Sequence, residues 1–385
     1  MNAATSPSIR RLRLTDFRSY ARLDLNISGR LVALAGANGS GKTNILEALS
    51  FLGPGRGLRR ALGSALPRKG GSGGYSILAD AEIDGAAILL ATAVQSGEAT
   101  RLCRIDREPV AGASRFLDHL SLLWLTPDQD GLFRGSAGDR RRFLDRLVLA
   151  IDPAHAPRAS AYENAMRQRN RLLEDERGDG RWLEAIEREM AELGTALAAA
   201  RRETVLRLAD LAARDADAVA PFPFAMLRLE GDVEGKLETC SALETEDWFR
   251  SALRENRWRD RQAGRALVGP QMSDLAVIHG PKREVAALCS TGEQKALLIG
   301  LVIAQARLIR QMRGAAPILL LDEIAAHLDE ARRAALFVML DALGGQAFMT
   351  GTDHALFSAL PTTGSCYDVA EGSVRLAVSS AMPVL

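Results

Sequence analysis

The stretch LVALAGANGSGKTNILEAL, residues 31–49, combines an apolar strand, a glycine-rich loop and a helix. Residues 36–43 match the pattern G-x-x-x-x-G-K-[ST] at every required position, and the flanking strand and helix supply the context that a phosphate-binding loop requires. Glycines allow the backbone N–H groups to surround phosphate oxygens, and the helix N-terminus adds partial positive charge. We therefore predict an α/β fold in which this loop binds the phosphates of a nucleotide.

The polar side chains of the loop supply specific contacts in this prediction. Lys42 places a cation on the β and γ phosphates, and the Thr43 hydroxyl coordinates Mg²⁺. The cofactors implied are ATP and Mg²⁺. The candidate nucleotide-binding residues are Gly36, Asn38, Gly39, Ser40, Gly41, Lys42, Thr43 and Asn44.

A second motif, ILLLDE at residues 318–323, supplies acidic groups that ATP hydrolysis requires. Its apolar residues predict a buried strand, and Asp322 stands at the C-terminal end, where α/β sheets place ligands. We predict that Asp322 acts on Mg²⁺ and that Glu323 is the catalytic base. Strands and helices alternate around this motif, which indicates a parallel sheet covered by helices.

The composition is that of an ordinary globular protein. The chain has 385 residues, a net charge of +1, 47% hydrophobic and 25% charged residues. Its four cysteines and five histidines are scattered, so we expect neither a disulfide framework nor a structural zinc site. No secretory signal is visible and no apolar run is long enough to span a membrane, so we expect a cytoplasmic location and no membrane partner.

Changes in sequence pattern divide the chain. Strand-like patterns occur at residues 8–27, 75–107 and 269–280. In the first of these, we expect two short strands around a turn at 15–20; in the second, antiparallel strands. Residues 136–220 are highly charged with helical periodicity, which predicts helices that could project as an arm. The predicted domains are residues 1–130 with 270–385, and an inserted, mostly helical domain of residues 131–269.

The segment CSTGEQK, residues 289–295, predicts a helix start with a capping box formed by Ser290 and Glu293. The order of phosphate loop, long insertion, S-x-G helix start, acidic strand and the tripeptide HLD resembles the ABC-type ATPases of the SMC kind. This resemblance implies that Ser290 and Gly292 contact the γ-phosphate bound by a second copy of the chain. A helix N-terminus suits that role because its free N–H groups bind anions. Asp329 of HLD would likewise cross the dimer interface.

Longer strings narrow the resemblance to the bacterial RecF family of recombination mediator ATPases, over nearly the whole chain. They include FRSY at 17–20, GRGLRR at 55–60, RRRFLD at 140–145, QRNRLL at 168–173 and VGPQMSDL at 268–275. The resemblance implies an α/β ABC-type ATPase head, with a mixed or parallel sheet built from both chain ends, and an inserted, mainly helical, arm-like domain. It also makes Gln129 a candidate metal ligand, beside Thr43 and Asp322.

The function implied by this resemblance is that of a weak ATPase in DNA repair, replication and recombination. ATP would drive head-to-head dimerisation, and the dimer would clamp double-stranded or junction DNA until slow hydrolysis released it. This cycle would promote loading of a recombinase on gapped DNA. RecR would be the partner, and RecO would act in the same pathway.

Several positions depart from the family pattern. Glu293 stands where glutamine is expected, and Gln271 and Met272 replace an expected His-Arg pair. The absence of that arginine removes one expected contact to phosphate or DNA. No histidine follows the strand QAFMT at the expected switch position, for which Thr352 is the first candidate and His354 the second.

Three arginine clusters are candidate contacts for DNA phosphates. Binding of DNA by such arginines would depend on salt concentration and would be largely independent of the DNA sequence. Arginine-rich helices also commonly form a solvated surface paired with acids, so each cluster has a structural alternative. Trp258 lies in the third cluster, and we expect it to be a core residue rather than a base-stacking one. The clusters are Arg140, Arg141, Arg142 and Arg146; Arg167, Arg169 and Arg171; and Arg254, Arg257, Arg259, Arg261 and Arg265.

Three other functions share part of this motif set. A transporter ATPase subunit has the same two nucleotide motifs, but the long insertion and the lack of hydrophobic partner segments argue against it. A head fused to a nuclease requires further clustered metal carboxylates, which the sequence does not supply. An inactive DNA scaffold is disfavoured by the intact Lys42, Asp322 and Glu323.

Overall fold

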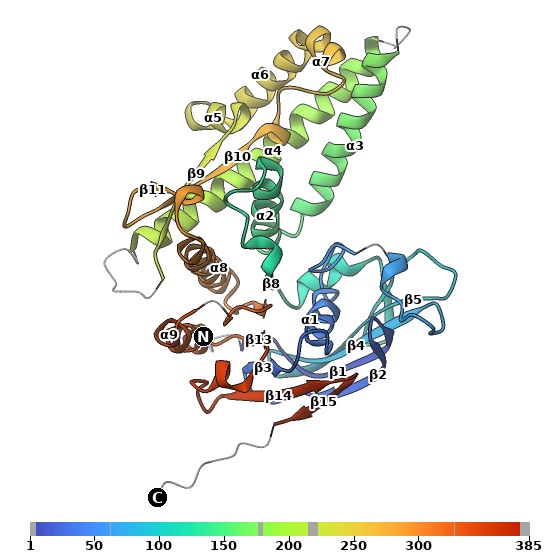
Figure 1. Cartoon of the computed structure of the whole chain (residues 1–385). Coiled ribbons are helices and arrows are strands. Elements are labelled where there is room, and N and C mark those ends of the chain that lie inside the picture. Colours follow the sequence, from blue (N-terminus) through green and yellow to red (C-terminus); the bar gives the residue numbers. More distant parts are fainter. Residues whose placement is uncertain (1–4, 62, 176–179, 215–221, 327, 378–385) are drawn as a thin grey trace, which may run out of the picture. The chain divides into compact units, whose positions relative to one another are not determined.

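The computed structural model describes residues 5–61, 63–175, 180–214, 222–326 and 328–377. The chain divides into two compact units (Figure 1), which we call the head unit, Met1–Asp130 with Leu301–Leu385, and the inserted unit, Gly131–Gly300. The boundary between them falls within helix α8, Thr291–Arg313. Residues 270–300, which the sequence pattern assigned to the head, pack with the inserted unit.

The first sheet of the head unit is antiparallel, with strand order β2-β1-β4-β5-β6-β7. The antiparallel strands predicted for residues 75–107 are therefore confirmed. The two N-terminal strands are longer than predicted, and the turn between them is reduced to Arg18 and Ser19. The strands are β1 Ser8–Phe17, β2 Tyr20–Asn26, β4 Tyr75–Ile83, β5 Ala86–Val94, β6 Leu102–Ile105 and β7 Glu108–Val110.

The second sheet of the head unit has the strand order β15-β14-β3-β13-β12-β8, and only β15 runs antiparallel to its neighbour. The N-terminal strand β3 lies between the C-terminal strands β13 and β14, so the mixed sheet built from both chain ends is confirmed. Every residue of β3, β12 and β13 is buried, as expected for strands of a covered parallel sheet. The strands are β3 Leu31–Ala35, β8 Leu122–Leu125, β12 Ile318–Leu321, β13 Ala347–Gly351, β14 Gly364–Ala370 and β15 Ser373–Leu376.

Helix α1, Lys42–Ser50, joins the two sheets of the head unit through one apolar core. Its Ile45 and Leu49 belong to the same buried cluster as Leu12 of the first sheet and Leu34 of the second. This packing holds the N-terminus of α1, and with it the glycine-rich loop, at the end of β3. The other helical segments of the head unit are η1 Gly63–Ala65, η2 Ala113–Asp118, η3 Pro127–Gln129, α9 Glu330–Leu343 and η6 His354–Phe357.

The inserted unit is mainly helical, as predicted from its periodicity. A core that includes Tyr162, Met190 and Phe249 joins α3, α4 and α6, and α5 contributes Val233. Its helical segments are α2 Ala137–Leu149, α3 His155–Glu174, α4 Gly180–Arg214, α5 Asp232–Thr239, α6 Ala242–Glu255, α7 Arg257–Ala263, η4 Pro270–Met272 and η5 Ala286–Leu288.

The strand predicted within residues 269–280 is β10, Asp274–His279, but it does not belong to the parallel sheet. It pairs antiparallel with β9, Ala225–Glu230, and β11, Glu284–Val285, in a separate sheet of the inserted unit. Its alternating burial is that of a strand covered on one face, which the parallel strands are not. Within the described residues, no helix is long and apolar enough to cross a membrane.

Candidate nucleotide site and signature helix

The glycine-rich loop follows β3 and is held by close backbone contacts. The Gly36 N–H donates to the Gly351 carbonyl at 3.2 Å, which ties the loop to the end of β13. A Cβ atom on Gly36 would lie 2.2 Å from the Val369 carbonyl, and one on Gly41 would lie 2.7 Å from the Tyr20 hydroxyl. Both positions therefore require glycine, and the loop keeps the shape that its sequence pattern predicts.

The side chain of Lys42 lies against the loop that precedes it. Its Nζ donates to the carbonyls of Gly36 and Ala37 at 2.6 and 2.8 Å, and the residue is only 5% exposed. Burial lowers the pKa of Lys42, and the carboxylates of Glu323 and Asp322 oppose that shift. The Ser40 hydroxyl is buried and, among the described residues, has no hydrogen-bond partner. An unsatisfied hydroxyl on a loop that also holds an ammonium group suits a phosphate oxygen as ligand.

Hydrogen bonds connect the start of α1 to the ends of β12 and β13. Thr43 Oγ1 donates to Asp322 Oδ1 at 2.9 Å, and Thr350 Oγ1 donates to the same oxygen at 2.7 Å. The Glu323 N–H then donates to Thr350 Oγ1 at 2.8 Å. The structure thus brings together Thr43, Asp322 and Glu323 from distant segments. Sequence reasoning missed Thr350, whose signal is a fully buried hydroxyl near the C-terminal end of a parallel strand.

The backbone of Glu323 is strained. Its φ is +52°, in the left-handed region that L-residues other than glycine rarely adopt. Such a conformation costs on the order of 1 kcal/mol or more and persists where surrounding contacts impose it. The Glu323 N–H bond to Thr350 is one such contact, and it turns the chain immediately after the buried Asp322.

The oxygen atoms of Thr43 and Asp322 fit Mg²⁺. They lie 2.9 Å apart, and a hydroxyl beside a carboxylate is a donor pair that hard cations prefer. Gln129, the third predicted metal ligand, uses its Oε1 to accept from the Thr126 N–H at 3.0 Å, as part of a capping box. Within the described part of the chain, no group of three or more His, Cys, Asp or Glu side chains forms a further metal site.

Two of the family-like strings meet at α1. Arg18 of FRSY donates through Nε and Nη2 to Glu47 at 2.8 and 2.7 Å, and Glu47 is fully buried. Arg59 of GRGLRR donates to Asn44 Oδ1 at 3.0 Å, and Asn44 in turn donates to Ser19 Oγ at 2.8 Å. These residues therefore fix the first two turns of the helix whose N-terminus faces the loop.

The capping box predicted at the start of α8 is present. The Ser290 N–H and hydroxyl both donate to Glu293 Oε2 at 2.9 Å, and the Glu293 N–H approaches Ser290 Oγ at 3.4 Å. Lys282 forms an ion pair with the other oxygen of Glu293. This bond and those from Ser290 lower the pKa of Glu293 to about 2. Ser290 and Gly292 are exposed, and a Cβ atom on Gly292 would meet nothing within 4 Å.

Two side chains donate hydrogen bonds to backbone carbonyls of the loop before Ser290. Arg134 donates through Nε and Nη2 to the carbonyls of Ala287 and Cys289 at 3.2 and 3.1 Å. Gln294 donates from Nε2 to the same two carbonyls at 3.3 and 2.7 Å. Their placement leaves the N-terminus of α8 exposed in a fixed orientation.

The remaining motif residues have identifiable local contacts. Asp329 is the N-cap of α9 and accepts from the Arg332 N–H at 2.8 Å. Thr352 and His354, the two switch candidates, are both exposed. His354 contacts Cys366 and Asp368 through its two ring nitrogens.

The arginine clusters do not form uniform surfaces. Arg169, one of the candidate DNA contacts, is fully buried and paired with Glu187 and Asp260, so the structural alternative holds for this residue. The expectation for Trp258 is wrong, because its side chain is 71% exposed rather than part of the core. The position of a residue in the helical repeat indicates whether its side chain is buried or exposed. The number of charged residues in a segment does not.

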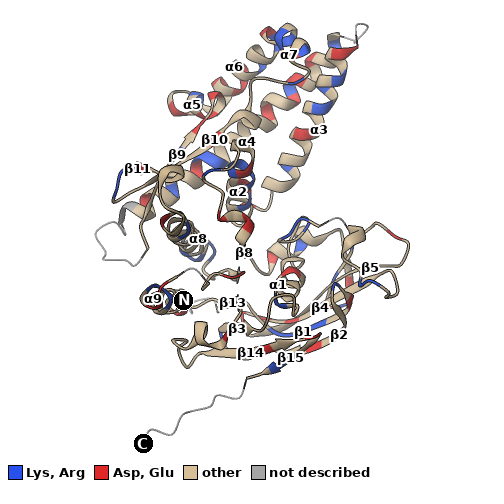
Figure 2. Cartoon of the chain, in the orientation of Figure 1, with Lys and Arg blue, Asp and Glu red and all other residues tan. Residues whose placement is uncertain are grey.

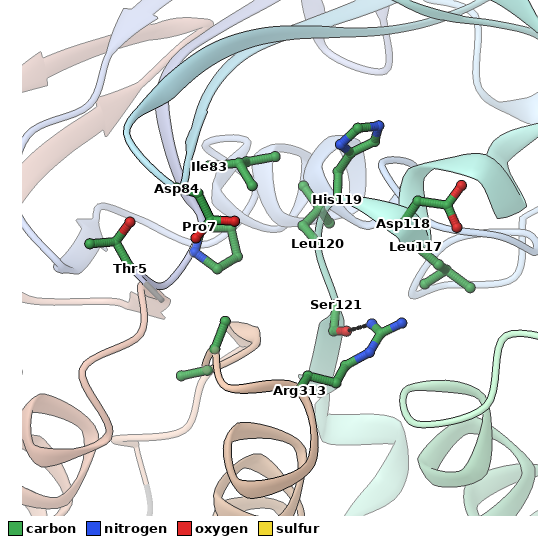
Figure 3. Close-up of a pocket in the computed structure, with 12 residues that line it drawn as sticks. Thr5, Pro7, Ile83, Asp84, Leu117, Asp118, His119, Leu120, Ser121 and Arg313 are labelled. Atoms are coloured by element: carbon green, nitrogen blue, oxygen red, sulfur yellow. Dashed lines mark hydrogen bonds between the residues drawn. The ribbon is translucent and has the colours of Figure 1, made fainter. Parts of the chain in front are cut away.

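A cavity of about 190 Å³ lies elsewhere in the head unit (Figure 3). Its lining includes Ser121 and Ala316, which precede the parallel strands β8 and β12. The glycine-rich loop follows the C-terminal end of β3, at the other edge of the same sheet. Arg313, which donates to Ser121 Oγ in this cavity, is therefore not part of the nucleotide site.

Comparisons with known proteins agree with this arrangement. The family model described as RecF/RecN/SMC N terminal domain matches residues 8–373. Proteins named "DNA replication and repair protein RecF" from Rhizobium etli strain CIAT 652 and Brucella abortus strain 2308 are 53% and 55% identical over 369 residues. That match spans 95% of this chain, and 98% and 96% of theirs.

The fold is also that of a solved structure. A chain described as "Structure of the recombination mediator protein RecF-ATPrS in RecFOR pathway" superposes with a TM-score of 0.85 at 19% identity, over 98% of this chain and 100% of that chain. By sequence over nearly its full length, and by fold, this chain belongs to the RecF family of DNA replication and repair proteins.

Proposed function

We propose that this protein is a weak ATPase that binds DNA and acts as a recombination mediator in DNA repair. The observation that supports this most directly is the link from Thr43 through Asp322 and Thr350 to Glu323, which couples the phosphate loop to a candidate catalytic base. The names of its relatives add support, since they are DNA replication and repair proteins. So does the solved RecF structure whose description includes a nucleotide.

In the proposed reaction, the loop N–H groups, Lys42 and Ser40 bind the phosphates of ATP. Thr43 and Asp322, with Gln129 as a further candidate ligand, would hold Mg²⁺, which would supply positive charge to the phosphates. Glu323 accepts a proton from the water that attacks the γ-phosphorus, and ADP and phosphate leave. The bond from the Glu323 N–H to Thr350 fixes the backbone that carries this carboxylate.

We further propose that two heads dimerise around two ATP molecules. Ser290 and Gly292 of one chain would contact the γ-phosphate bound by the other, and Asp329 would lie at the same interface. The exposed Gly292 supports this proposal. Glycine destabilises a helix by about 1 kcal/mol relative to alanine, yet nothing within 4 Å in this chain would obstruct a Cβ there. Close approach of another molecule would explain the glycine.

The dimer would hold double-stranded or junction DNA and release it after slow hydrolysis, which would promote loading of a recombinase. RecR is the proposed partner, with RecO in the same pathway, because the solved relative is described as part of the RecFOR pathway. A cytoplasmic location is consistent with four cysteines that are all free.

Sedimentation velocity with and without ATP tests the composite site. We expect Ser290→Arg to abolish ATP-dependent dimerisation while the monomer still folds and binds ATP, and Lys42→Met to abolish it through loss of ATP binding. The matched control is Ser241→Arg. Ser241 forms the same capping box with Glu244 on α6, at 2.8 Å from both its N–H and its hydroxyl. If Ser290→Arg dimerises as the wild type does, the composite site is wrong.

A further inference from the structure

A second cavity, in the inserted unit, is lined by more positive than negative charge. It encloses about 280 Å³ between α2, α3, α4 and η4, near the lower end of the sizes typical of ligand pockets. Tyr162 and Gln271 contribute to its wall. Its charged lining residues are Arg141, Arg142, Arg167, Arg201, Asp145 and Glu163. Figure 2 marks further basic residues along the same helices.

The two carboxylates of the cavity are already engaged. Asp145 accepts from Nε and Nη2 of Arg201 at 2.7 and 2.9 Å, and also contacts His155 Nε2 at 2.9 Å. Glu163 lies 3.8 Å from Arg167, and both side chains are mostly exposed. Arg201 is itself buried and donates its remaining group to the Pro270 carbonyl at 2.6 Å. Neither of these acids pairs with Arg141, and Arg142 is paired with Asp139, which does not line the cavity.

Arg141 is the member of the cluster without a carboxylate of its own. It donates from Nη1 to the Ser273 carbonyl at 2.6 Å, and it forms no ion pair among the residues that the structure describes. Burial lowers the pKa of Arg141, the charge of Arg201 adds to that shift, and Asp274 and Asp145 oppose it. Asp274 itself is paired in a bidentate contact with Arg140. Arg141 is thus partly desolvated beside like charges, an arrangement that a bound anion would stabilise.

We propose that this cavity is a phosphate-binding site for the nucleic-acid backbone, in which Arg141 and Arg142 contact the phosphate oxygens directly. Arg201 forms a fixed part of the cavity wall, since all its donor groups are already bonded to Asp145 and Pro270. Guanidinium groups match phosphate through paired N–H donors, and Arg142 lies exposed at the rim, where a continuous strand can pass.

This inference rests on the proposed DNA-binding function and assigns that function to one of the three arginine clusters. The test is fluorescence anisotropy of a labelled duplex with the full-length protein and a non-hydrolysable ATP analogue, over a series of salt concentrations. We expect Arg141→Gln and Arg142→Gln each to weaken DNA binding about tenfold, the effect of losing one charge-assisted hydrogen bond. The slope of log K against log salt concentration should fall in magnitude by about 0.9 per lost contact.

Matched variants separate this effect from loss of charge or loss of folding. Arg254→Gln removes one exposed arginine from the cluster around Trp258 and should leave affinity and slope near those of the wild type. Arg141→Lys keeps the charge and should recover the salt slope. If Arg141→Gln fails to fold, Arg142→Gln carries the test because that side chain is exposed. Equal affinity for Arg142→Gln and the wild type would overturn the assignment.

A second measurement identifies the source of the phosphate. Inorganic phosphate, compared with chloride at the same ionic strength, should raise the melting temperature of the wild type more than that of Arg141→Gln. If phosphate stabilises the wild type selectively but DNA affinity is unchanged in the variants, the site takes a free phosphate compound and the nucleic-acid assignment is wrong. If the wild type binds no DNA in any nucleotide state, the proposed function and this assignment both fail.

Discussion

Replacing Arg169 with methionine is expected to destabilise the inserted unit strongly. The guanidinium is fully buried and donates to Glu187 Oε1 at 3.0 Å, Asp260 Oδ2 at 2.7 Å and the Leu253 carbonyl at 2.6 Å. Methionine fills a similar space but satisfies none of these acceptors. Asp260 would lose this ion pair and keep the Leu267 N–H bond to its other oxygen at 2.9 Å, inside a buried site.

The expected size of the loss follows from this geometry. Removing one partner of a buried ion pair typically costs about 3–5 kcal/mol, because the remaining charge stays buried without its counterion. Glu187 retains a contact with Arg257 at 2.6 Å, so we expect the lower half of that range, roughly 3–4 kcal/mol. For a unit of this size, each 1 kcal/mol shifts the melting temperature by about 2–4 °C, so a fall of roughly 6–16 °C should result.

Urea denaturation followed by tryptophan fluorescence measures this effect in the inserted unit, which contains Trp182, Trp248 and Trp258. Arg171→Met is the matched control, since Arg171 lies on the same helix but is exposed, and it should change stability by no more than about 0.5 kcal/mol. ATP binding by the head unit should be unchanged in both variants. A loss below about 1 kcal/mol for Arg169→Met would refute a structural role for this network.

Glu323→Gln should slow ATP hydrolysis by about 100-fold or more and let an ATP-bound dimer accumulate in gel filtration; hydrolysis at the wild-type rate would exclude Glu323 as the base. Gly292→Ala should leave the monomer equally stable or more stable in thermal unfolding, yet weaken ATP-dependent dimerisation, and unimpaired dimerisation would show that no partner approaches this position. The pKa of Glu293 is lowered from 4.5 to about 2, so its contribution to stability is present above about pH 4.5 and is lost as the pH falls toward 2. In Lys282→Met, which removes the largest cause of that shift, the acid-dependent loss should be smaller and should be complete at a higher pH in acid titrations followed by circular dichroism, and an unchanged acid transition would contradict the ion-pair assignment.

The parts of the site that the sequence predicted are those whose chemistry is confined to a few consecutive residues. The phosphate loop, the Asp322–Glu323 pair after an apolar strand and the capping box at Ser290 each need only a short spacing and a neighbouring element. The parallel sheet followed from alternating strands and helices. Thr350 could not be assigned in this way, because its role depends on the parallel pairing that places the end of β13 beside the end of β12.

Two other predictions differ from the structure: one because strand pairing is non-local, the other because burial was not considered. The segment that forms β10 was assigned to the head, but its pairing partner β9 lies within the inserted segment and no local pattern linked the two. Arg169 was counted with its charged neighbours. It shares a helix face with Tyr162, Ala165 and Leu173, all buried, and a spacing of three or four residues along α3 carried that signal. The arginine count alone therefore could not separate surface residues from buried ones, whereas the helical spacing could.

The position of β3 in its sheet has a consequence for synthesis of the protein on the ribosome. The phosphate loop emerges early, but the strands on both sides of β3 are β13 and β14, which lie more than 300 residues later in the chain. The Gly36 N–H is tied to Gly351, and the loop packs against the Val369 carbonyl. A nascent chain therefore cannot assemble the nucleotide pocket until translation has passed residue 370, and pairings so distant in sequence fold slowly. Truncated translation products should consequently bind no ATP.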